Sequence, residues 1–391
     1  MSFKTLNIEE LIGWSDLFTD EEKLVRASVK RFVVDKCMPK IVESFENEKF
    51  PSELVSQMAK LGLFGADLDG YRCAGMSATA YGMACHELEA CDSSLRSFVS
   101  VQTSLCMYSI YHFGTEDQKQ YWLPAMASGK IISCFGLTEP NSGSDPSKIK
   151  TKAYKDGNHW VLSGSKAWIT NAQLADIAII WAKTGKDNSI QGFIVEKDCA
   201  NFSSDKIFHK LSFRASSTGS LHLNEVKVPE ANRIVKAVGL SAPLSCLNNA
   251  RFSVAFGVLG AAYDCLERAI KYSKNRYQFG SPIAKKQLIQ HKLAIMSTEL
   301  TRSALSSIHF AKLKDSNKIH PAHVSLLKRS NCNIAIMIAR EARIIFGANG
   351  IVNTSHILRH SLNLESIITY EGSEEIHSLI IGRYLTGEYA F

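Results

Sequence analysis

The chain has 391 residues, of which 45% are hydrophobic and 21% charged, a composition typical of globular domains. Its length predicts two or three domains rather than one simple core. No apolar run reaches the roughly 20 residues that a membrane span needs, and the first residues match neither a secretory signal nor a transit peptide. We therefore expect no membrane segment and a cytoplasmic location of the bacterial type, or the mitochondrial matrix for a processed eukaryotic chain.

The formal net charge is +7, but the basic residues are spread along the chain and form no Lys/Arg block. Nucleic-acid binding is therefore not indicated, whereas a polyanionic substrate and a mixed solvated surface both fit. The 10 cysteines include no Cys-x-x-Cys pair, and several, such as Cys85, Cys106 and Cys265, lie in apolar helical contexts. We expect buried free thiols, with no disulfide framework and no metal site.

From Thr19 to about Gly129 the sequence predicts helices. The run Thr19-Asp20-Glu21-Glu22 is a capping box, in which a hydroxyl and a carboxylate satisfy free N–H groups at a helix start, and apolar pairs follow at helical spacing. A second capping box, Thr115-Glu116-Asp117-Gln118, follows Gly114, which is expected to end the preceding helix.

From Ile131 to about Pro229 the apolar pattern shortens to that of strands. The runs that carry it are residues 159–162, 177–182, 191–195 and 220–226. Turn-forming pairs such as Asp156-Gly157 and Ser163-Gly164 lie between them. The close spacing of these runs predicts an antiparallel sandwich or barrel.

After Pro243 the pattern is helical again, with long apolar stripes of 3.6-residue period over residues 251–276, 286–314 and 321–346. Pro282 and Pro321 fall at expected helix boundaries. The predicted fold class is therefore mainly α with a central β domain. We expect an N-terminal helical domain at residues 1–130, the β domain at 131–240 and a C-terminal helical bundle at 241–391.

The sequence has no P-loop, no Gly-x-Gly-x-x-Gly turn and no His-Glu-x-x-His helix. Two runs remain as candidate cofactor sites. The stretch 134–145 is rich in glycine and hydroxyl groups, which suits phosphates or a polar heterocycle but also an ordinary loop. The run 166–171 joins Trp168 to Thr170, so an indole could stack on a flat ring while the hydroxyl bonds its edge; a core Trp in an edge strand is the alternative.

A third candidate is Glu371, in the run of residues 368–377. Gly372 allows a sharp turn there, and Ser373 is a good N-cap for the helix that follows. A carboxylate held in an apolar cleft has a raised proton affinity, which suits a general base. A capping or surface glutamate is the alternative reading of the same residue.

Taken together and in this order, the runs resemble the acyl-CoA dehydrogenase family. The phrases that carry the resemblance are Leu137-Thr138-Glu139-Pro140, Gly143-Ser144-Asp145, Trp168-Ile169-Thr170-Asn171, Arg276-Tyr277-Gln278-Phe279-Gly280, Gln287-Leu288-Ile289-Gln290 and Phe346-Gly347-Ala348-Asn349-Gly350. The resemblance extends from about Thr19 to Phe391. It implies an N-terminal helical domain, a β-sandwich or barrel and a C-terminal four-helix bundle, with FAD as cofactor, a homotetramer, and electron-transfer flavoprotein as electron acceptor.

The resemblance also implies roles for single residues. Glu371 matches the catalytic base that removes the α-proton of an acyl-CoA thioester, while the β-hydride passes to the flavin. Residues that match FAD contacts, some of them across a subunit interface, are Phe135, Leu137, Thr138, Trp168, Ile169, Thr170, Arg276, Phe279, Gln287, Phe346, Gly347 and Ser373. Residues that match acyl-CoA contacts are Ser144, Leu247, Asn248, Arg251 and Gly372. The family often has Thr where this chain has Ser373, so the hydroxyl is retained.

Within the family the chain most resembles the glutaryl-CoA dehydrogenases. The phrases involved are Ser94-Leu95-Arg96-Ser97, Cys246-Leu247-Asn248-Asn249-Ala250-Arg251, Leu326-Leu327-Lys328-Arg329 and Tyr370-Glu371-Gly372-Ser373. In that group the arginine matching Arg96 binds the distal carboxylate of the substrate, and Glu89, Ser97 and Tyr370 match its polar pocket. The resemblance therefore implies oxidation of glutaryl-CoA with loss of CO2 to give crotonyl-CoA, a step of lysine and tryptophan degradation.

The sequence around Arg96 is compatible with this substrate class. Small and apolar residues flank it on a predicted helix, and a fatty acyl pocket would leave its guanidinium buried and unpaired, whereas a dicarboxylic chain offers a planar partner. Glu89 and Arg96 are 96 − 89 = 7 residues apart, so we expect one helix face to present both. A surface or ion-paired arginine is the alternative, and a short-chain acyl-CoA dehydrogenase without decarboxylation is the alternative function.

Overall fold

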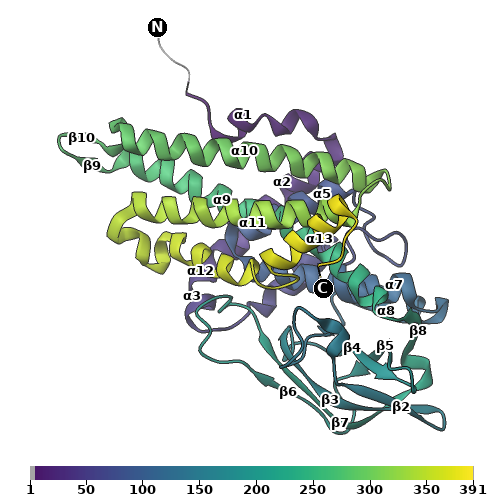
Figure 1. Cartoon of the computed structure of the whole chain (residues 1–391). Helices are drawn as coiled ribbons and strands as arrows, with labels where there is room; N and C mark the ends of the chain where they lie inside the picture. The colour runs from purple at the N-terminus through teal and green to yellow at the C-terminus, as the bar shows by residue number, and fades with distance from the viewer. Residues whose placement is uncertain (1–4, 391) are drawn as a thin grey trace.

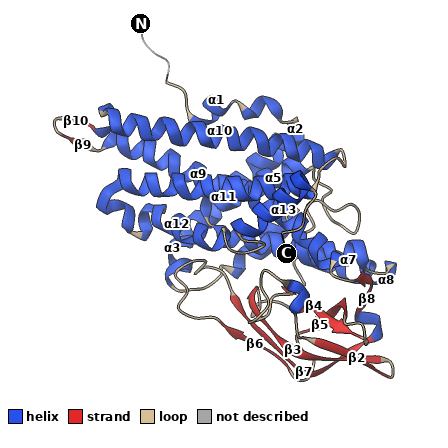
Figure 2. Cartoon of the chain, viewed as in Figure 1, coloured by secondary structure: helices blue, strands red, loops and turns tan. Residues whose placement is uncertain are grey.

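The computed structural model of the chain describes residues 5–390, which form a helical, a β and a second helical region in chain order (Figure 1). Figure 2 shows most of the strands gathered on one side of the molecule, below the stacked helices, while a short hairpin at residues 277–282 lies apart at one end of the helices. The predicted order of helical, β and helical regions is therefore confirmed. The domain limits at residues 130 and 240 remain a prediction.

Two capping boxes start helices of the first region, as the sequence predicts. Thr19 Oγ1 accepts from Glu22 N at 3.2 Å, and Thr115 Oγ1 accepts from Gln118 N at 3.2 Å. Each hydroxyl satisfies an N–H group that has no partner within the first helical turn. The helices are α1 Ile8–Ile12, α2 Asp20–Phe32, α3 Met38–Glu46, α4 Val55–Lys60, α5 Ala78–Cys91, α6 Ser93–Ser100, α7 Tyr108–Phe113 and α8 Glu116–Ala127.

The β region forms an 8-stranded sheet of order β6-β7-β3-β2-β4-β5-β8, with β1 paired to β4. Most neighbours are antiparallel, but β1 and β2 both run parallel to β4. Strand β4 is buried over most of its length, which its nearly unbroken apolar sequence requires. The strands are β1 Ser133–Gly136, β2 Lys152–Asp156, β3 His159–Thr170, β4 Ile177–Thr184, β5 Ser189–Glu196, β6 Phe202–Lys206, β7 Thr218–Pro229 and β8 Arg233–Val238.

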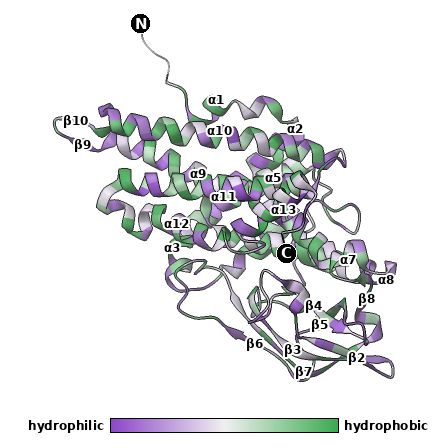
Figure 3. Cartoon of the chain, viewed as in Figure 1, coloured by the Kyte–Doolittle hydropathy of each residue, from purple (hydrophilic) through white to green (hydrophobic). Residues whose placement is uncertain are grey.

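Three long helices dominate the last region, and polar and apolar residues alternate along them in Figure 3. The first begins at Ser241, before the predicted start at residue 251, and carries Pro243 in its opening turn. Proline is tolerated there because that N–H has no helical partner. The elements are α9 Ser241–Asn275, β9 Tyr277–Gln278, β10 Ser281–Pro282, α10 Gln287–Asp315, α11 Pro321–Phe346, α12 Ile357–Ile367 and α13 Glu374–Thr386.

Helices α5 and α9 approach each other closely at two glycines. A Cβ atom on Gly260 would lie 1.9 Å from His86 O, and one on Gly257 would lie 2.2 Å from Glu89 Oε2. A larger residue at Gly260 would push the helices apart, because it would meet the backbone of α5, and one at Gly257 would displace the side chains of Glu89 and Arg96. Because nearly all of α5 is buried, this contact holds Glu89 in the interior of the molecule.

The ten cysteines are free, and all but Cys73 and Cys199 are buried, as the sequence predicts. Within residues 5–390, no group of three or more His, Cys, Asp or Glu side chains is arranged to hold a metal ion. None of the helices in that same range is long and apolar enough to cross a membrane.

Candidate active site

Glu371 lies in the tight turn between α12 and α13. Its backbone is left-handed, with φ 52°, and Gly372 follows with φ 98°. Ser373 then caps α13, because its hydroxyl accepts from Ile376 N at 3.4 Å. A Cβ on Gly372 would lie 3.0 Å from His377 Nε2 and 3.2 Å from Arg251 Nη2, so the turn requires glycine for space as well as for backbone conformation.

Two cations donate to the backbone of this turn. Arg251 Nε donates to Glu371 O at 2.6 Å, and Lys328 Nζ donates to Tyr370 O at 2.9 Å and to Gly372 O at 2.6 Å. Arg251 also donates to Asn248 Oδ1 at 3.0 Å. The structure therefore brings Arg251 and Asn248, expected at the acyl-CoA, to the turn of the expected base.

The Glu371 side chain is half-buried within this cationic surrounding. Burial raises its pKa, although the positive charges of Arg96, Lys328 and Arg251 act in the opposite direction. Its Oε2 atom is buried and has no hydrogen-bond partner in the described part of the chain. A carboxylate with a buried, unpaired oxygen and a raised pKa is well suited to accept a proton.

The Arg96 side chain is fully buried on α6. Its Nε donates to Glu89 Oε2 at 2.6 Å, and its Nη2 donates to the hydroxyl of Tyr370, the residue before Glu371. The remaining nitrogen, Nη1, is buried and finds no hydrogen-bond partner within residues 5–390. One donor of a desolvated cation is therefore available to a ligand, and a carboxylate is its best partner.

Glu89 and Arg96 lie together, but they do not share a helix face, and the ion pair between them was the alternative reading of Arg96. Asp92 is extended, with φ −163°, and separates α5, which carries Glu89, from α6, which carries Arg96. Its Oδ1 accepts from Ser94 N at 2.8 Å and starts the new helix. The prediction of one continuous helix was therefore wrong, because the chain turns at this cap.

Unpaired polar atoms remain on both members of this ion pair. Ser97, expected in the same polar pocket, is buried on α6, and Glu89 Oε1 is buried without a partner among the described residues. Buried polar atoms are nearly always hydrogen-bonded, so the unpaired Arg96 Nη1 and Glu89 Oε1 indicate a polar ligand.

The two candidate cofactor runs lie side by side in the sheet. Ala167 N donates to Thr138 O at 3.0 Å, and the buried Lys166 Nζ donates to Leu137 O at 3.2 Å. Lys166 also pairs with Glu139 at 2.8 Å, which ties the end of β1 to β3. These contacts join the stretch 134–145 to the run 166–171.

Trp168 offers a flat surface beside this junction. Its side chain is 63% exposed and its backbone is left-handed, with φ 60°, whereas Ile169 is buried and Thr170 is half-buried. An exposed indole on a strained strand, next to the half-buried Thr138, fits a planar ring with polar edges. Phe135 and Leu137 are buried behind it, and Ser144 is exposed in the loop.

A second group of expected cofactor residues lies away from this junction. Arg276, Phe279 and Gln287 are exposed at the β9–β10 hairpin and the start of α10, at one end of the helical bundle (Figure 1). Phe346 stacks on Tyr272 with ring centroids 4.2 Å apart, and Gly347 is exposed at the end of α11. No hydrogen bond, ion pair or ring contact found within residues 5–390 joins this group to Trp168, and the expectation that part of the FAD site comes from another subunit remains a prediction.

Sequence reasoning assigned no role to Lys328, Gly257 or His377. Lys328 lies in the apolar stripe of α11, where a lysine is unusual, and that was the available signal. His377 is buried, with Nδ1 3.1 Å from Ser325 Oγ, and burial lowers its pKa to about 3. Leu247 is half-buried on α9 beside Asn248.

Comparisons with known proteins agree with this arrangement. The chain is 48% identical to a glutaryl-CoA dehydrogenase from Mycobacterium smegmatis in complex with FADH2; the match has a TM-score of 0.97 and covers 99% of this chain and 100% of that one. It is 35% identical to an acyl-CoA dehydrogenase of Bacillus subtilis, over 94% of this chain and 99% of that protein. It is 32% identical to the mitochondrial short-chain specific acyl-CoA dehydrogenase of Bos taurus, over 96% and 95%.

Three family models match successive parts of the chain. They describe the N-terminal domain of acyl-CoA dehydrogenases at residues 19–130, the middle domain at 134–226 and the C-terminal domain at 238–386. Together they account for most of the sequence. The chain belongs to the acyl-CoA dehydrogenase family.

Proposed function

We propose that this protein carries out the FAD-dependent oxidative decarboxylation of glutaryl-CoA to crotonyl-CoA and CO2. The observation that carries the proposal is the buried guanidinium of Arg96, which has one free donor and is joined through Tyr370 to the Glu371 turn. A monocarboxylic acyl chain would leave that donor buried and unpaired. The distal carboxylate of a glutaryl chain supplies its partner.

Glu371 is the proposed catalytic base. The α-proton of a thioester is weakly acidic, so its removal needs an oriented acceptor and hydrogen bonds on the thioester oxygen. The left-handed turn fixes the carboxyl group, and Arg251 and Lys328 hold the carbonyl oxygens on both sides of it. The raised pKa of Glu371 favours uptake of the proton.

FAD is the proposed cofactor, and when bound it accepts the hydride that leaves the β-carbon. Thr138, Trp168, Ile169 and Thr170 are proposed to hold its ring, together with Phe135 and Leu137 at the end of β1. Arg276, Phe279, Gln287, Phe346, Gly347 and Ser373 are proposed for the rest of the molecule. Support comes from the exposed, strained indole of Trp168 and from the relative whose structure is in complex with FADH2.

The decarboxylation follows from the same pocket. After oxidation the substrate is an enoyl dicarboxylic thioester, and breaking its bond to the distal carboxyl group releases CO2 and leaves an electron pair on the chain. That pair takes up a proton, for which the protonated Glu371 is the proposed donor, to give crotonyl-CoA. Ser97 and Tyr370 are the proposed polar neighbours of the departing group.

Several assembly features complete the proposal. The exposed apolar side chains Phe279, Leu288 and Leu385 suit burial between subunits of a homotetramer. Electron-transfer flavoprotein is the proposed electron acceptor, and the cytoplasm is the proposed location.

The acyl-CoA is proposed to lie along Ser144, Leu247, Asn248 and Arg251, with Gly372 next to the base.

The proposal is tested by adding glutaryl-CoA anaerobically to the purified yellow protein and recording the flavin absorbance. Wild type should bleach, and crotonyl-CoA and CO2 should appear when an acceptor is supplied. Glu371→Gln should bleach at least about 100-fold more slowly, because a positioned base contributes about that much. Equal bleaching in that variant would remove Glu371 from the mechanism.

A short-chain acyl-CoA dehydrogenase is the second candidate, since curated relatives with that name are 32% identical over nearly their full length. The two functions differ in their use of Arg96. If kcat/KM for butyryl-CoA exceeds that for glutaryl-CoA, the second candidate replaces the first.

A further inference from the structure

Two positively charged side chains hold the backbone of the turn that carries Glu371. Glu371 and Gly372 have φ values of 52° and 98°, a region that residues other than glycine rarely adopt. The carbonyl oxygens of Tyr370 and Gly372 accept from Lys328 Nζ, and that of Glu371 accepts from Arg251 Nε. An unusual backbone conformation therefore persists where two charged donors fix three successive carbonyl groups.

Lys328 is the less expected of the two donors. Its side chain is 1% exposed in the middle of α11, and an ammonium group is costly to bury unless it is paired. Both of its hydrogen-bond partners are backbone oxygens, and none of the ion pairs found within residues 5–390 includes it. Its Nζ also lies 5.9 Å from the centre of the Tyr370 ring. The compensation for burying Lys328 therefore comes from the turn itself.

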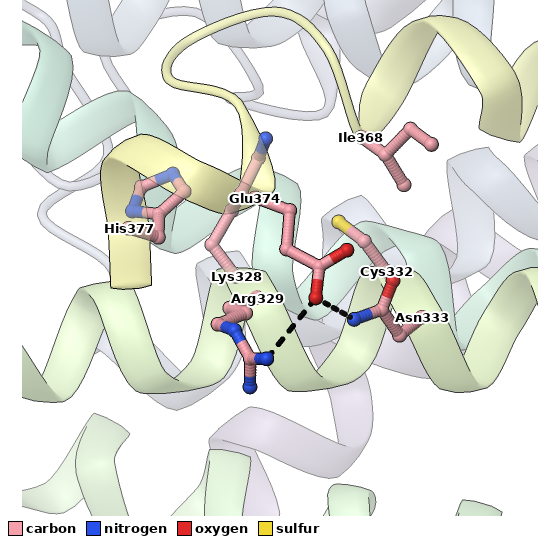
Figure 4. Close-up of a pocket in the computed structure, with 7 residues that line it drawn as sticks. All are labelled: Lys328, Arg329, Cys332, Asn333, Ile368, Glu374 and His377. Atoms are coloured by element: carbon pink, nitrogen blue, oxygen red, sulfur yellow. Dashed lines mark hydrogen bonds and ion pairs between the residues drawn. The ribbon is translucent and has the colours of Figure 1, made fainter. Parts of the chain in front are cut away.

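Figure 4 shows how Lys328 differs from its neighbour on α11. The Lys328 side chain rises from the helix to the turn, whereas Arg329 reaches sideways to Glu374. Arg329 Nη2 lies 3.1 Å from Glu374 Oε1, and its Nε donates to Ser378 Oγ at 2.8 Å. Adjacent cations on one helix thus have different partners. Arg329 forms a partly exposed ion pair, and Lys328 donates its hydrogen bonds to the Glu371 turn.

Building on the proposed function, we propose that Lys328 is a positioning residue for the base: it holds the Glu371 turn by two carbonyl oxygens, and its charge favours the carboxylate form of Glu371. It acts through Glu371 and has no direct contact with the substrate in this assignment. A neutral donor in its place would keep part of the first effect and lose the second.

The charges around Glu371 predict how its pKa changes when Lys328 is replaced. Burial raises the pKa of Glu371, and the charges of Arg96, Lys328 and Arg251 lower it. Two of these cations also have other partners: Arg96 pairs with Glu89, and Arg251 donates to Asn248. Removing the charge of Lys328 should therefore raise the pKa of Glu371 further. The titratable and charged groups facing Glu371 are Arg251 on α9, Lys328 and Cys332 on α11, Arg96 on α6, Glu89 on α5, Tyr370 in the turn and His377 on α13.

The test compares wild type with Lys328→Gln and Lys328→Arg as FAD-loaded proteins. The rate of anaerobic flavin reduction by glutaryl-CoA is measured from about pH 6 to pH 9. In Lys328→Gln the acid limb of the profile should move to higher pH, so that the loss of rate is about tenfold greater near pH 6 than near pH 9. Lys328→Arg keeps the charge and should keep the limb near its wild-type position.

A matched control lies next to Lys328 in the sequence. Arg329→Gln removes the same charge from the same helix without touching the carbonyl groups of the turn. Its acid limb should coincide with that of wild type. A uniform loss of rate at all pH values in Lys328→Gln, with the limb unmoved, would show a structural role only and would overturn the inference.

A second readout separates this inference from the proposed function. Difference infrared spectra taken against Glu371→Gln follow the titration of the Glu371 carboxyl group without any substrate. If glutaryl-CoA fails to reduce the wild-type flavin but the carboxyl group titrates at higher pH in Lys328→Gln, the proposed function fails and the inference stands. If wild type is active and neither the carboxyl titration nor the acid limb moves, the inference fails alone. Should Lys328→Gln not retain flavin, the same two measurements on Lys328→Arg decide: a limb displaced to higher pH despite the retained charge contradicts the proposal, and an unmoved limb supports it.

Discussion

Arg96 and Glu89 form a buried ion pair whose charges cancel, so the acyl pocket gains no net positive charge from this pair. What the pair offers is a directed donor, because Glu89 and Tyr370 occupy two nitrogens of the guanidinium and leave Nη1 free. A planar group with one free edge selects a carboxylate by geometry as well as by charge.

This arrangement predicts the behaviour of Arg96→Gln. The variant should lower kcat/KM for glutaryl-CoA by about 10- to 150-fold, the range expected for losing one charge-assisted hydrogen bond. The ratio of butyryl-CoA to glutaryl-CoA turnover should rise, and steady-state kinetics with both thioesters measure it. An unchanged ratio would mean that Arg96 does not read the distal carboxylate.

The single variant leaves Glu89 buried without its cation, so its effect mixes two causes. Glu89→Gln combined with Arg96→Gln removes both charges and restores neutrality. If the double variant recovers folding stability but not the preference for glutaryl-CoA, the selectivity belongs to Arg96. Recovery of the preference in the double variant would assign the loss to the stranded Glu89 carboxylate instead.

At this scale the sequence alone left Glu371 undecided between base and cap, and the resemblance to a family was what distinguished them. The closeness of Glu89 and Arg96 was predicted for the wrong reason, since Asp92 breaks the helix between them. The position of Lys328 in the apolar stripe of α11 marks it as unusual, but spacing alone gives it no role, because lysine can also extend along apolar surface and keep its charge in water. Its role depends on where α12 and α13 place the turn, which is a tertiary contact.

Helix α6 is tied to α12 by a buried polar cluster. Asp92 Oδ1 caps α6, while its Oδ2 accepts from Arg359 Nε at 2.9 Å and from Asn363 Nδ2 at 2.9 Å. Arg359 also donates to Cys91 O at 3.0 Å, and both charged side chains are fully buried. The helix that carries Arg96 and the helix that leads to Glu371 thus share one anchor, which sets the distance between the two ends of the proposed substrate site.

Arg359→Met should therefore be strongly destabilising. It removes one partner of a buried pair and leaves Asp92 charged in the interior, a change that costs about 3–5 kcal/mol. A large fall in Tm, with early loss of flavin, is expected in a thermal melt followed by circular dichroism and flavin fluorescence.

The surface pair Arg340 and Glu365 supplies the control. Its atoms are 3.1 Å apart with side chains 68% and 51% exposed, so Arg340→Met should cost less than about 1 kcal/mol. Similar Tm values for the two variants would contradict the idea that the Asp92 cluster anchors α6 to α12.

Capping boxes and long apolar stripes were predictable elements, because both arise from contacts within a few residues. The start of α9 was missed, since Pro243 suggests a break when it is in fact accommodated in a first turn. The order of strands in the sheet and the parallel pairing of β1 with β4 depend on contacts between distant segments, and nothing in the local pattern specifies them.

For the molecule as a whole, the order of helical and β regions followed from the change in apolar period along the chain. The division of the expected cofactor residues into two separated groups did not, because it is a property of the assembled bundle and sheet. One group lies at Trp168 beside the sheet, and the other lies at the exposed β9–β10 hairpin with Phe279, which is 93% exposed. The proposed homotetramer would cover residues as exposed as these.

The buried carboxylates of the helical core predict how the folded protein responds to acid. Burial alone would raise the pKa of Asp264, but a hydrogen bond from His360 and the charge of Arg268 lower it to about 2. Burial would also raise the pKa of Glu87, but His86 and Arg26 lower it to about 2. A carboxyl group whose folded-state pKa lies below its unfolded value stabilises the protein above the unfolded value and loses that contribution as pH falls towards the folded value.

The free energy of unfolding should therefore fall steeply between about pH 4.5 and pH 2, where these groups must take up protons. Asp264→Asn should lower stability at neutral pH and flatten the fall, because one of the titrating groups is gone. Urea titrations at several pH values measure both effects, with the exposed Asp205→Asn as the matched control. Asp205 interacts with His222 at 2.9 Å while 78% exposed, so its loss should leave the slope unchanged. An acid profile of Asp264→Asn parallel to that of wild type would show that the carboxylate is not a source of the acid sensitivity.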